Sequence, residues 1–178
     1  MVYILIAEGF EEIEALAVAD ILRRANIKTI LVSVDNKSRV TGAHGISIET
    51  DVNISDISDD YKVLFLPGGY PGYENLEKNE KVKELIIDAY NNKKIIAAIC
   101  AAPSILGHLN LLDGRDACCF PSFEKELIGA NVSFDDVVCS DNIITSRGAG
   151  TAHKLGFKLV EILTDAQTAQ NLSKTMIF

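Results

Sequence analysis

The stretch Lys94–Pro103 reads KIIAAICAAP, an apolar run that leads directly into a cysteine followed by two more small residues. A short apolar run without polar alternation is typical of a strand buried on both faces of a parallel sheet. Small residues on both sides of Cys100 allow the close backbone approach that a tight turn requires. The stretch therefore predicts a buried strand, a turn at Cys100 and a helix that begins at once.

Similar apolar runs stand elsewhere in the chain, and most are followed by a helical pattern. The expected strands are Val2–Ile6, Ile27–Val34, Val63–Leu66, Ile95–Ile99, Val137–Cys139 and Ile143–Thr145, and the expected helices are Glu11–Ala25, Glu80–Asn91, Ala101–His108, one that ends near Leu163, and Asp165–Lys174. This alternation predicts an α/β fold with a doubly wound, mostly parallel sheet sandwiched by helices. The segments Val40–Glu49 and Val137–Thr145 favour local antiparallel additions. No linker divides residues 1–178, which indicates a single domain.

Composition argues against several classes of function. The 178 residues carry a net charge of -8 without any basic cluster, which argues against binding of nucleic acid or of an anionic membrane. The longest apolar run, Ile95–Gly107, is shorter than the ~20 residues that span a bilayer. The N-terminus has no basic region before its apolar stretch, so we expect no signal peptide and a cytoplasmic location. The four cysteines have no CxxC spacing and are then expected to be reduced thiols.

Cys100 is the candidate nucleophile. In open α/β sheets, ligands bind at the carboxyl ends of the strands, and Cys100 directly follows such an end. A sulfur at a helix N-terminus meets free N–H groups and the positive end of the helix dipole, which favours the thiolate. The alternative is that Cys100 merely packs, because free cysteine is among the most buried residue types. The turn favours the reactive role, whereas we expect Cys118, Cys119 and Cys139 to be structural.

Glu14 is the candidate carboxylate partner. The other members of its face of the first helix are all apolar: Ala17, Val18, Ile21 and Ala25. Because burial of an ionised carboxylate is costly, Glu14 should bind its proton unusually tightly. A protonated Glu14 can donate a hydrogen bond to the Cys100 sulfur, and an ionised one can act as a general base. The alternative role, a first-turn carboxylate that stabilises the helix N-terminus, describes Glu11 and Glu12 well.

The segment Leu66–Gly72 reads LPGGYPG and follows a buried strand. Paired glycines let the backbone turn its N–H groups toward a neighbouring atom. The N–H of Gly69, together with that of Ala101, is therefore a candidate oxyanion hole, with Gly68 beside the substrate. The alternative is a plain strand-to-helix turn, and the glycines alone do not decide between the two.

No cofactor and no metal are expected. The GxGxxG pattern is absent after the first strand, and there is no P-loop. No group of histidines, cysteines or carboxylates has the spacing of a metal site. We expect His108 and His153 to be structural, whereas His44, between glycines in TGAHG, is a candidate for contact with a substrate or a partner chain.

Four motifs stand in the following order: AEGFEEIE at Ala7–Glu14, LPGG at Leu66–Gly69, AAICAAP at Ala97–Pro103 and TSRGAGT at Thr145–Thr151. Together they resemble the ThiJ/PfpI superfamily, and within it the branch of the Parkinson-disease-associated deglycase and its small bacterial homologues, over essentially the whole chain. The resemblance implies a flavodoxin-like sandwich and a homodimer. It also implies that Cys100 is a redox-sensitive nucleophile and that Glu14 is a protonated glutamate hydrogen-bonded to it. Gly69 and Ala101 match the positions whose backbone amides face the site.

Two departures from the superfamily pattern bear on mechanism. Its proteases carry a histidine directly after the cysteine, where this chain has Ala101, so protease activity is not expected. Phe120 stands where the disease-associated protein has a histidine, which leaves Glu14 alone to move protons. His44 and Arg24 match two positions at which the disease-associated protein carries arginine near the site or the dimer interface. In this chain the first arginine is replaced by His44, and the second is kept as Arg24. We therefore expect His44, Arg24 and Phe120 beside the substrate.

The resemblance leaves more than one function open, because members are described as glyoxalases, protein deglycases, stress chaperones or peroxide sensors. The first hypothesis is a stress-response enzyme whose Cys100 thiolate attacks reactive 2-oxoaldehydes such as methylglyoxal, or acts on glycated groups. The second is a non-enzymatic redox sensor or chaperone in which Cys100 is oxidised to sulfinate. A third is a scaffold with an inert cysteine. We expect a reactive thiol with a pKa below the ordinary ~8.5.

Overall fold

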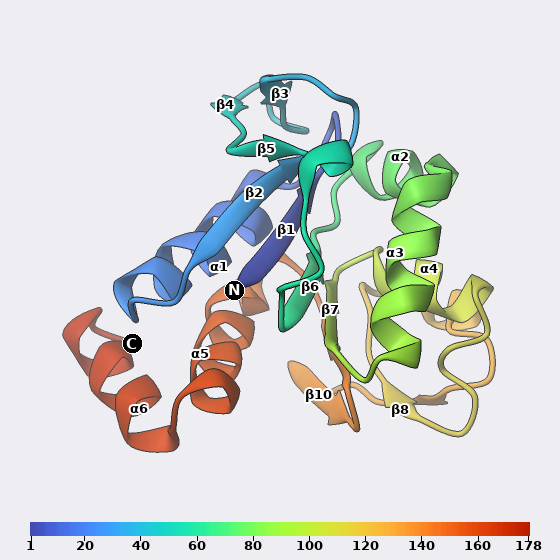
Figure 1. Cartoon of the computed structure of the whole chain (residues 1–178). Helices are drawn as coiled ribbons and strands as arrows, with labels where there is room; N and C mark the ends of the chain where they lie inside the picture. Colours follow the sequence, from blue (N-terminus) through green and yellow to red (C-terminus); the bar gives the residue numbers. More distant parts are fainter.

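The computed structural model describes all of residues 1–178, and its centre is a seven-stranded sheet (Figure 1). The strand order is β10-β11-β7-β6-β1-β2-β5. These strands are β1 (Val2–Ile6), β2 (Thr29–Ser33), β5 (Val52–Asn53), β6 (Val63–Leu66), β7 (Ile95–Ile99), β10 (Val137–Ser140) and β11 (Ile143–Ser146). Every pairing is parallel except that between β10 and β11. The α/β fold predicted from the sequence is confirmed.

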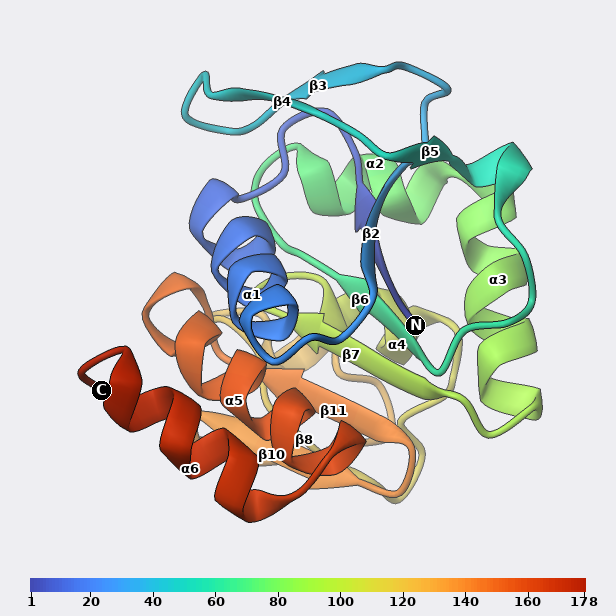
Figure 2. The ribbon, with the colours of Figure 1, turned by 60° about the vertical axis from the view of Figure 1, so that its left-hand side comes forward.

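Helices cover both faces of the sheet (Figure 2). On one side lie α1 (Glu12–Arg24), α5 (Ala152–Leu163) and α6 (Ala166–Thr175), and on the other lie α2 (Gly72–Lys78), α3 (Glu80–Asn91) and α4 (Pro103–His108). None of these helices has the length and hydrophobicity needed to cross a membrane. The expected sandwich of helices around the sheet is therefore present.

Each face of the sheet has its own hydrophobic core. Along β1, Tyr3 and Leu5 belong to the core beneath α2, α3 and α4. Val2, Ile4 and Ile6 belong to the core beneath α1, α5 and α6. Successive side chains of a strand point to opposite faces, so a strand covered on both sides must be apolar at every position. This requirement explains the unbroken apolar runs in the sequence.

Smaller elements lie around the main sheet. β3 (Arg39–Thr41) and β4 (Ser47–Glu49) form the antiparallel hairpin expected within Val40–Glu49. β8 (Asp116–Ala117) and β9 (Asn131–Val132) form a short parallel pair. The 3-10 helices are Ile54–Asp56, Glu124–Glu126 and Ala149–Thr151.

Three sequence-based expectations need correction. The antiparallel pairing expected within Val137–Thr145 is present between β10 and β11, but β11 is not a local addition, because it pairs in parallel with β7 within the main sheet. The helix expected from Ala101 begins at Pro103. Helix α2 was not expected at all, because residues 72–78 bury only Gly72 and Leu76 and so show no apolar period.

The sheet also determines where loops converge. Strands β7, β6 and β1 are adjacent and parallel, so their carboxyl ends meet at one edge. The chain leaves this edge through residues 7–11, 67–71 and 100–102. Ligands of open α/β sheets bind at this kind of edge, so the three segments form the place to look for a site.

Candidate active site

Cys100 lies on the turn between β7 and α4, with a φ angle of 64°. A non-glycine residue at positive φ is uncommon and costs on the order of 1 kcal/mol, and such residues cluster at functional sites. The turn is held from outside, because the N–H of Cys100 donates to the carbonyl of Ser146 at 3.0 Å and the N–H of Phe120 donates to the carbonyl of Cys100 at 2.8 Å. The predicted strand and turn at Cys100 are confirmed.

Glu14 lies in the first turn of α1, and only 1% of it is exposed. Its Oε2 accepts a hydrogen bond from the N–H of Gly68 at 2.8 Å. Its Oε1 is buried without a nitrogen or oxygen partner. The one side chain that acts on this carboxyl group as a hydrogen-bond partner is that of Cys100. The structure therefore brings together the two side chains that the sequence singled out.

Gly68 makes this approach possible. A Cβ atom at this position would lie 2.7 Å from the Cβ of Cys100 and 2.8 Å from Oε2 of Glu14. Both distances are far below van der Waals contact, so any side chain at position 68 would push Cys100 and Glu14 apart.

Gly68→Ala should therefore slow alkylation of Cys100 at neutral pH by about tenfold and lower the free energy of unfolding by about 1–3 kcal/mol. The measurements are the rate of iodoacetamide labelling at Cys100, read by mass spectrometry, and urea unfolding. Gly150→Ala is the matched control, because a Cβ at Gly150 would meet nothing within 4 Å. Equal behaviour of the two variants would show that the contact between Cys100 and Glu14 does not control the thiol.

Two backbone N–H groups face the sulfur. Those of Ala101 and Gly69 hydrogen-bond to Cys100 and so lower its pKa. Gly69 has a φ angle of 90°, and a Cβ there would lie 2.3 Å from the backbone nitrogen of Glu11. Only glycine fits this position. Both amides lie where the sequence predicted them, and their role as an oxyanion hole stays a prediction.

Cys100 and Glu14 titrate as a pair, because each side chain lies close enough to shift the pKa of the other. Burial raises the pKa of Glu14 to about 7. Burial, followed by the negative charge of an ionised Glu14, raises the pKa of Cys100 to about 12. The pair therefore loses its first proton near neutral pH and then holds one proton over several pH units.

The reactivity of the pair depends on which atom keeps that proton. An ionised Glu14 would accept from the N–H of Gly68 and from the Cys100 thiol, whereas a thiolate at Cys100 would accept from the N–H groups of Gly69 and Ala101 and from a protonated Glu14. Hydrogen bonds to a charged form favour that form, so we assign the proton to Glu14 and the charge to the sulfur. The thiol pKa below ~8.5 expected from the sequence requires this assignment, since burial and an ionised Glu14 both oppose it.

The pair opens into a cavity of about 400 Å³. The cavity is lined by Glu11, Glu14, Gly69, Tyr70, Tyr73, Cys100, Ala101, Phe120, Phe123 and Ala149. Most of these residues are apolar, and no histidine, lysine or arginine is among them. Cys100 is half-buried at the wall of this cavity, so a small molecule has access to the sulfur.

The four residues expected beside the substrate differ in position. Gly68 lies against Cys100 and Glu14 but does not line the cavity. Phe120 lines the cavity. His44 lies in the β3–β4 turn and does not line it, although its Nδ1 is 3.5 Å from Oε2 of Glu11, which does. Arg24 lies in the last turn of α1, about 15 Å along the helix from Glu14, and pairs with Asp20 at 2.6 Å. The structure does not bring Arg24 into this cavity.

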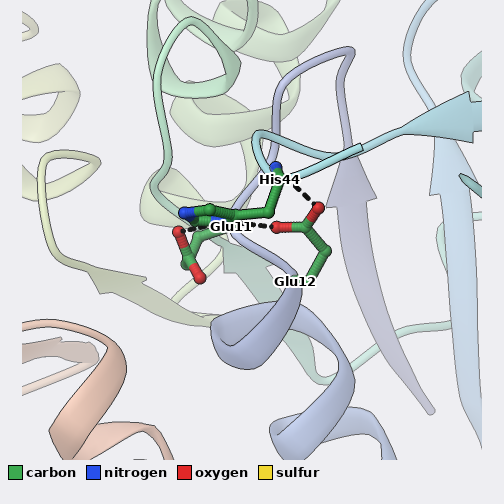
Figure 3. A group of neighbouring side chains, drawn as sticks. All are labelled: Glu11, Glu12 and His44. Carbon is green, nitrogen blue, oxygen red and sulfur yellow. Dashed lines mark hydrogen bonds and ion pairs between the residues drawn. The ribbon is translucent and has the colours of Figure 1, made fainter. Parts of the chain in front are cut away.

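Glu12 has a role that the sequence did not indicate (Figure 3). Its Oε1 accepts hydrogen bonds from the N–H groups of His44 at 2.8 Å and Ile46 at 3.3 Å, and its Oε2 lies 2.9 Å from Nδ1 of His44. A Cβ at Gly42 would lie 2.4 Å from this carboxyl group. The side chain thus fills the β3–β4 turn and ties it to α1. The glycine after Thr41 was the available signal, because it leaves room for an inserted side chain.

Glu11, Glu12 and His44 offer one ligand atom each within 4.8 Å of one another, which is the spacing of a possible metal site. Both oxygens of Glu12 already bond within the hairpin, however. We therefore interpret this group as a clamp between the hairpin and α1.

The clamp leads to a prediction about the pKa of His44. The hydrogen bond that His44 donates to Glu12, and next the charge of Glu11, raise the pKa of His44. Glu12→Gln should lower the pKa of His44 toward its ordinary value, as measured by NMR titration of the imidazole protons. Glu49→Gln, an exposed change on β4, is the control and should leave the titration unchanged. A His44 titration unaffected by Glu12→Gln would contradict the clamp.

The other cysteines lie outside the cavity. Cys118 and Cys119 are buried, and Cys139 is on β10. Burial raises the pKa of all three thiols, that of Cys119 to about 12. None of them has a partner carboxyl group like Glu14, which accords with the structural role expected for them.

The chain is similar in sequence to one known protein family and to several of its characterised members. The family model described as "DJ-1/PfpI family" matches residues 1–162. Protein dj-1beta of Drosophila melanogaster is 32% identical over 177 residues, which covers 98% of this chain and 95% of that protein. A protein of Caenorhabditis elegans, "Glutathione-independent glyoxalase DJR-1.2", is 32% identical over 171 residues, or 95% of this chain and 91% of its own length.

The fold has close counterparts among solved structures. The structure "Toxoplasma gondii DJ-1, oxidized" superimposes with a TM-score of 0.95 at 30% sequence identity, covering 99% of this chain and 97% of that one. The sheet order and the helical layers described above are therefore those of an established fold. The resemblance drawn from the four sequence motifs is confirmed.

Proposed function

The chain belongs to the DJ-1/PfpI family, and from this premise we propose that it is a cysteine-dependent enzyme that converts 2-oxoaldehydes into 2-hydroxy acids. The observation that carries the proposal is the proximity of Cys100 and Glu14 at the wall of a largely apolar cavity. The similarity to a C. elegans protein named as a glutathione-independent glyoxalase supports the same chemistry. Family membership alone does not define an activity, so the argument depends on the site.

The reaction begins at the sulfur. The Cys100 thiolate adds to the aldehyde carbon, and the new oxyanion lies against the N–H groups of Gly69 and Ala101. Glu14 gives its proton to that oxygen, which produces a neutral hemithioacetal. These steps use every group that faces the sulfur.

Glu14 then moves the second proton. In its ionised form it removes the hydrogen of the former aldehyde carbon as a proton and returns it to the neighbouring carbonyl carbon, while the hydroxyl proton passes to the neighbouring oxygen. The first carbon is thereby oxidised to a thioester and the second is reduced to an alcohol, so no external oxidant or cofactor is needed. Water hydrolyses the thioester, releases the 2-hydroxy acid and restores the thiol. Once the sulfur is bound to the substrate and carries no charge, burial still holds the pKa of Glu14 above its ordinary value, which suits proton transfer in both directions at neutral pH.

The test is formation of lactate from methylglyoxal by the purified protein without added thiol or metal, followed by chiral chromatography. The proposal predicts turnover together with a stoichiometric loss of methylglyoxal. A protein that forms no lactate while its Cys100 still reacts rapidly with iodoacetamide would contradict the proposed enzyme.

A second candidate is a redox sensor or chaperone in which Cys100 is oxidised to sulfinate. It is favoured by the half-buried sulfur beside a carboxyl donor, and by the similarity to a T. gondii structure described as oxidised. Mass spectrometry after mild peroxide treatment separates it from the enzyme, because the sensor requires that Cys100 oxidises before the other three cysteines.

The proposal also includes a cellular location, an oligomeric state and a further class of substrates. We place it in the cytoplasm, with a homodimer as the working state and glycated groups as further carbonyl substrates. Ala101 directly after the nucleophile, and a cavity without histidine, argue against peptide hydrolysis.

A further inference from the structure

On the basis of the proposed 2-oxoaldehyde activity, we propose that this cavity selects uncharged substrates with an apolar substituent as large as an aryl ring, and that Glu11 is the residue that excludes anionic carbonyl compounds. The inference names a substrate class that the activity itself leaves open. It depends on the wall of the cavity rather than on the pair of Cys100 and Glu14.

Much of the cavity wall is aromatic. Tyr70, Tyr73, Phe120 and Phe123 all line the cavity. Tyr73 and Phe123 pack edge to face, with ring centroids 5.4 Å apart, and so form a fixed part of the wall. Tyr70 and Phe120 are 71% and 46% exposed, so their rings have apolar surface free for contact with a bound molecule.

The size of the cavity exceeds what methylglyoxal needs. A volume of about 400 Å³ falls within the range of about 300–1,000 Å³ typical of sites that enclose drug-sized ligands. A three-carbon substrate at Cys100 would leave most of the aromatic wall in contact with water. An aryl substituent would bury that wall, and burial of one phenyl ring raises affinity by roughly 10- to 100-fold.

The charge of the cavity excludes anions. Its ionisable carboxyl groups are those of Glu11 and Glu14, and no lysine, arginine or histidine lines it. Glu11 is the N-cap residue of α1, and 15% of its side chain is exposed. The cation that pairs with Glu11 is His44, which also pairs with Glu12, so the group of two carboxylates and one imidazolium keeps a net negative charge. A carboxylate on the substrate would find no partner here and would be repelled by Glu11.

The test compares kcat/KM for three substrates: methylglyoxal, phenylglyoxal and 4-carboxyphenylglyoxal. We expect phenylglyoxal to exceed methylglyoxal by about tenfold or more, and to exceed its carboxylated analogue by about tenfold or more. Phe120→Ala should reduce the first ratio and Glu11→Gln the second. Glu84→Gln, an exposed change on α3, is the control and should alter neither ratio. Equal kcat/KM values for the three substrates, or ratios unmoved by the two cavity variants, would overturn the inference.

A readout without turnover separates this inference from the proposed function. The ratio of Cys100 alkylation rates with neutral iodoacetamide and anionic iodoacetate, relative to the same ratio for N-acetylcysteine, measures charge exclusion alone. We expect it to be about tenfold in favour of iodoacetamide and to fall in Glu11→Gln. If no substrate yields a 2-hydroxy acid, the enzyme proposal fails. A ratio near that of N-acetylcysteine shows instead that Glu11 does not exclude anions.

Discussion

Cys100→Ser should abolish formation of 2-hydroxy acid from methylglyoxal, with a fall in kcat/KM on the order of 10³ or more. A serine hydroxyl at this position would have no strong base beside it if Glu14 keeps the proton as proposed, because no histidine lines the cavity. Serine has nearly the size of cysteine and can occupy the same turn. The loss should therefore appear in kcat while circular dichroism and thermal unfolding stay close to those of the wild type.

The matched controls are the other thiols. Cys118→Ser and Cys139→Ser remove cysteines that do not line the cavity, and we expect each to keep activity within about threefold of the wild type. Activity in Cys100→Ser above a tenth of the wild-type value would contradict a covalent mechanism at Cys100. Loss of activity in Cys139→Ser at intact stability would point to a different nucleophile.

Glu14→Gln should change how the free energy of unfolding depends on pH. Burial raises the pKa of Glu14 to about 7, above the ordinary value of 4.5. A raised pKa means that the folded protein binds a proton more tightly than the unfolded chain does. Its contribution to stability is thus fully present below pH 4.5 and is lost as pH rises through 7. The difference between the ordinary pKa of 4.5 and the raised pKa of about 7 corresponds to about 3 kcal/mol of unfolding free energy, at ~1.4 kcal/mol per pKa unit.

The measurement is urea unfolding of the wild type and of Glu14→Gln between pH 4 and 8. As pH rises over this range, we expect the free energy of unfolding of the wild type to fall by about 2–3 kcal/mol relative to that of Glu14→Gln. The pH dependence of stability depends on how many protons Cys100 and Glu14 bind together. It is therefore the same whether the remaining proton is on Glu14 or on Cys100. Glu84→Gln removes an exposed carboxylate and is the control. A constant difference across the range would show that Glu14 is not buried as the structure describes.

The sequence alone predicted the main sheet because every central strand is buried on both faces. Such strands must be apolar throughout, and the runs at β1, β6 and β7 show this directly. The candidate pair was found in the same way. Glu14 is a charged residue on an apolar helix face, and Cys100 follows a strand without any spacer.

The errors came from features that depend on distant residues. The position of β11 in the sheet depends on its parallel partner β7, nearly fifty residues earlier, and its own four residues contain no such information. Helix α2 turns only Gly72 and Leu76 to the interior, so it lacks an apolar period.

Polar positions were harder to place than apolar ones. Two adjacent glutamates at a helix start predict dipole stabilisation equally for both, yet Glu12 enters the β3–β4 turn while Glu11 faces the cavity. Only the folded path of the hairpin separates their roles. Arg24 matches a family position near the site or the dimer interface, but within one chain it lies at the far end of α1 and pairs with Asp20.

The central claim is that a protonated Glu14 and two backbone amides keep Cys100 anionic near neutral pH. The most direct test is the pH dependence of iodoacetamide alkylation at Cys100, measured peptide by peptide, in the wild type and in Glu14→Gln. The two assignments of the shared proton predict opposite effects of this substitution.

If Glu14 keeps the proton, alkylation of the wild type should rise with an apparent pKa at or below about 7. Glu14→Gln should then raise that value by about one unit, because a weaker amide donor replaces a carboxylic acid. If Glu14 is ionised instead, reactivity in the wild type should appear only at strongly alkaline pH, and Glu14→Gln should lower the apparent pKa by removing a negative charge. That second result would contradict the account.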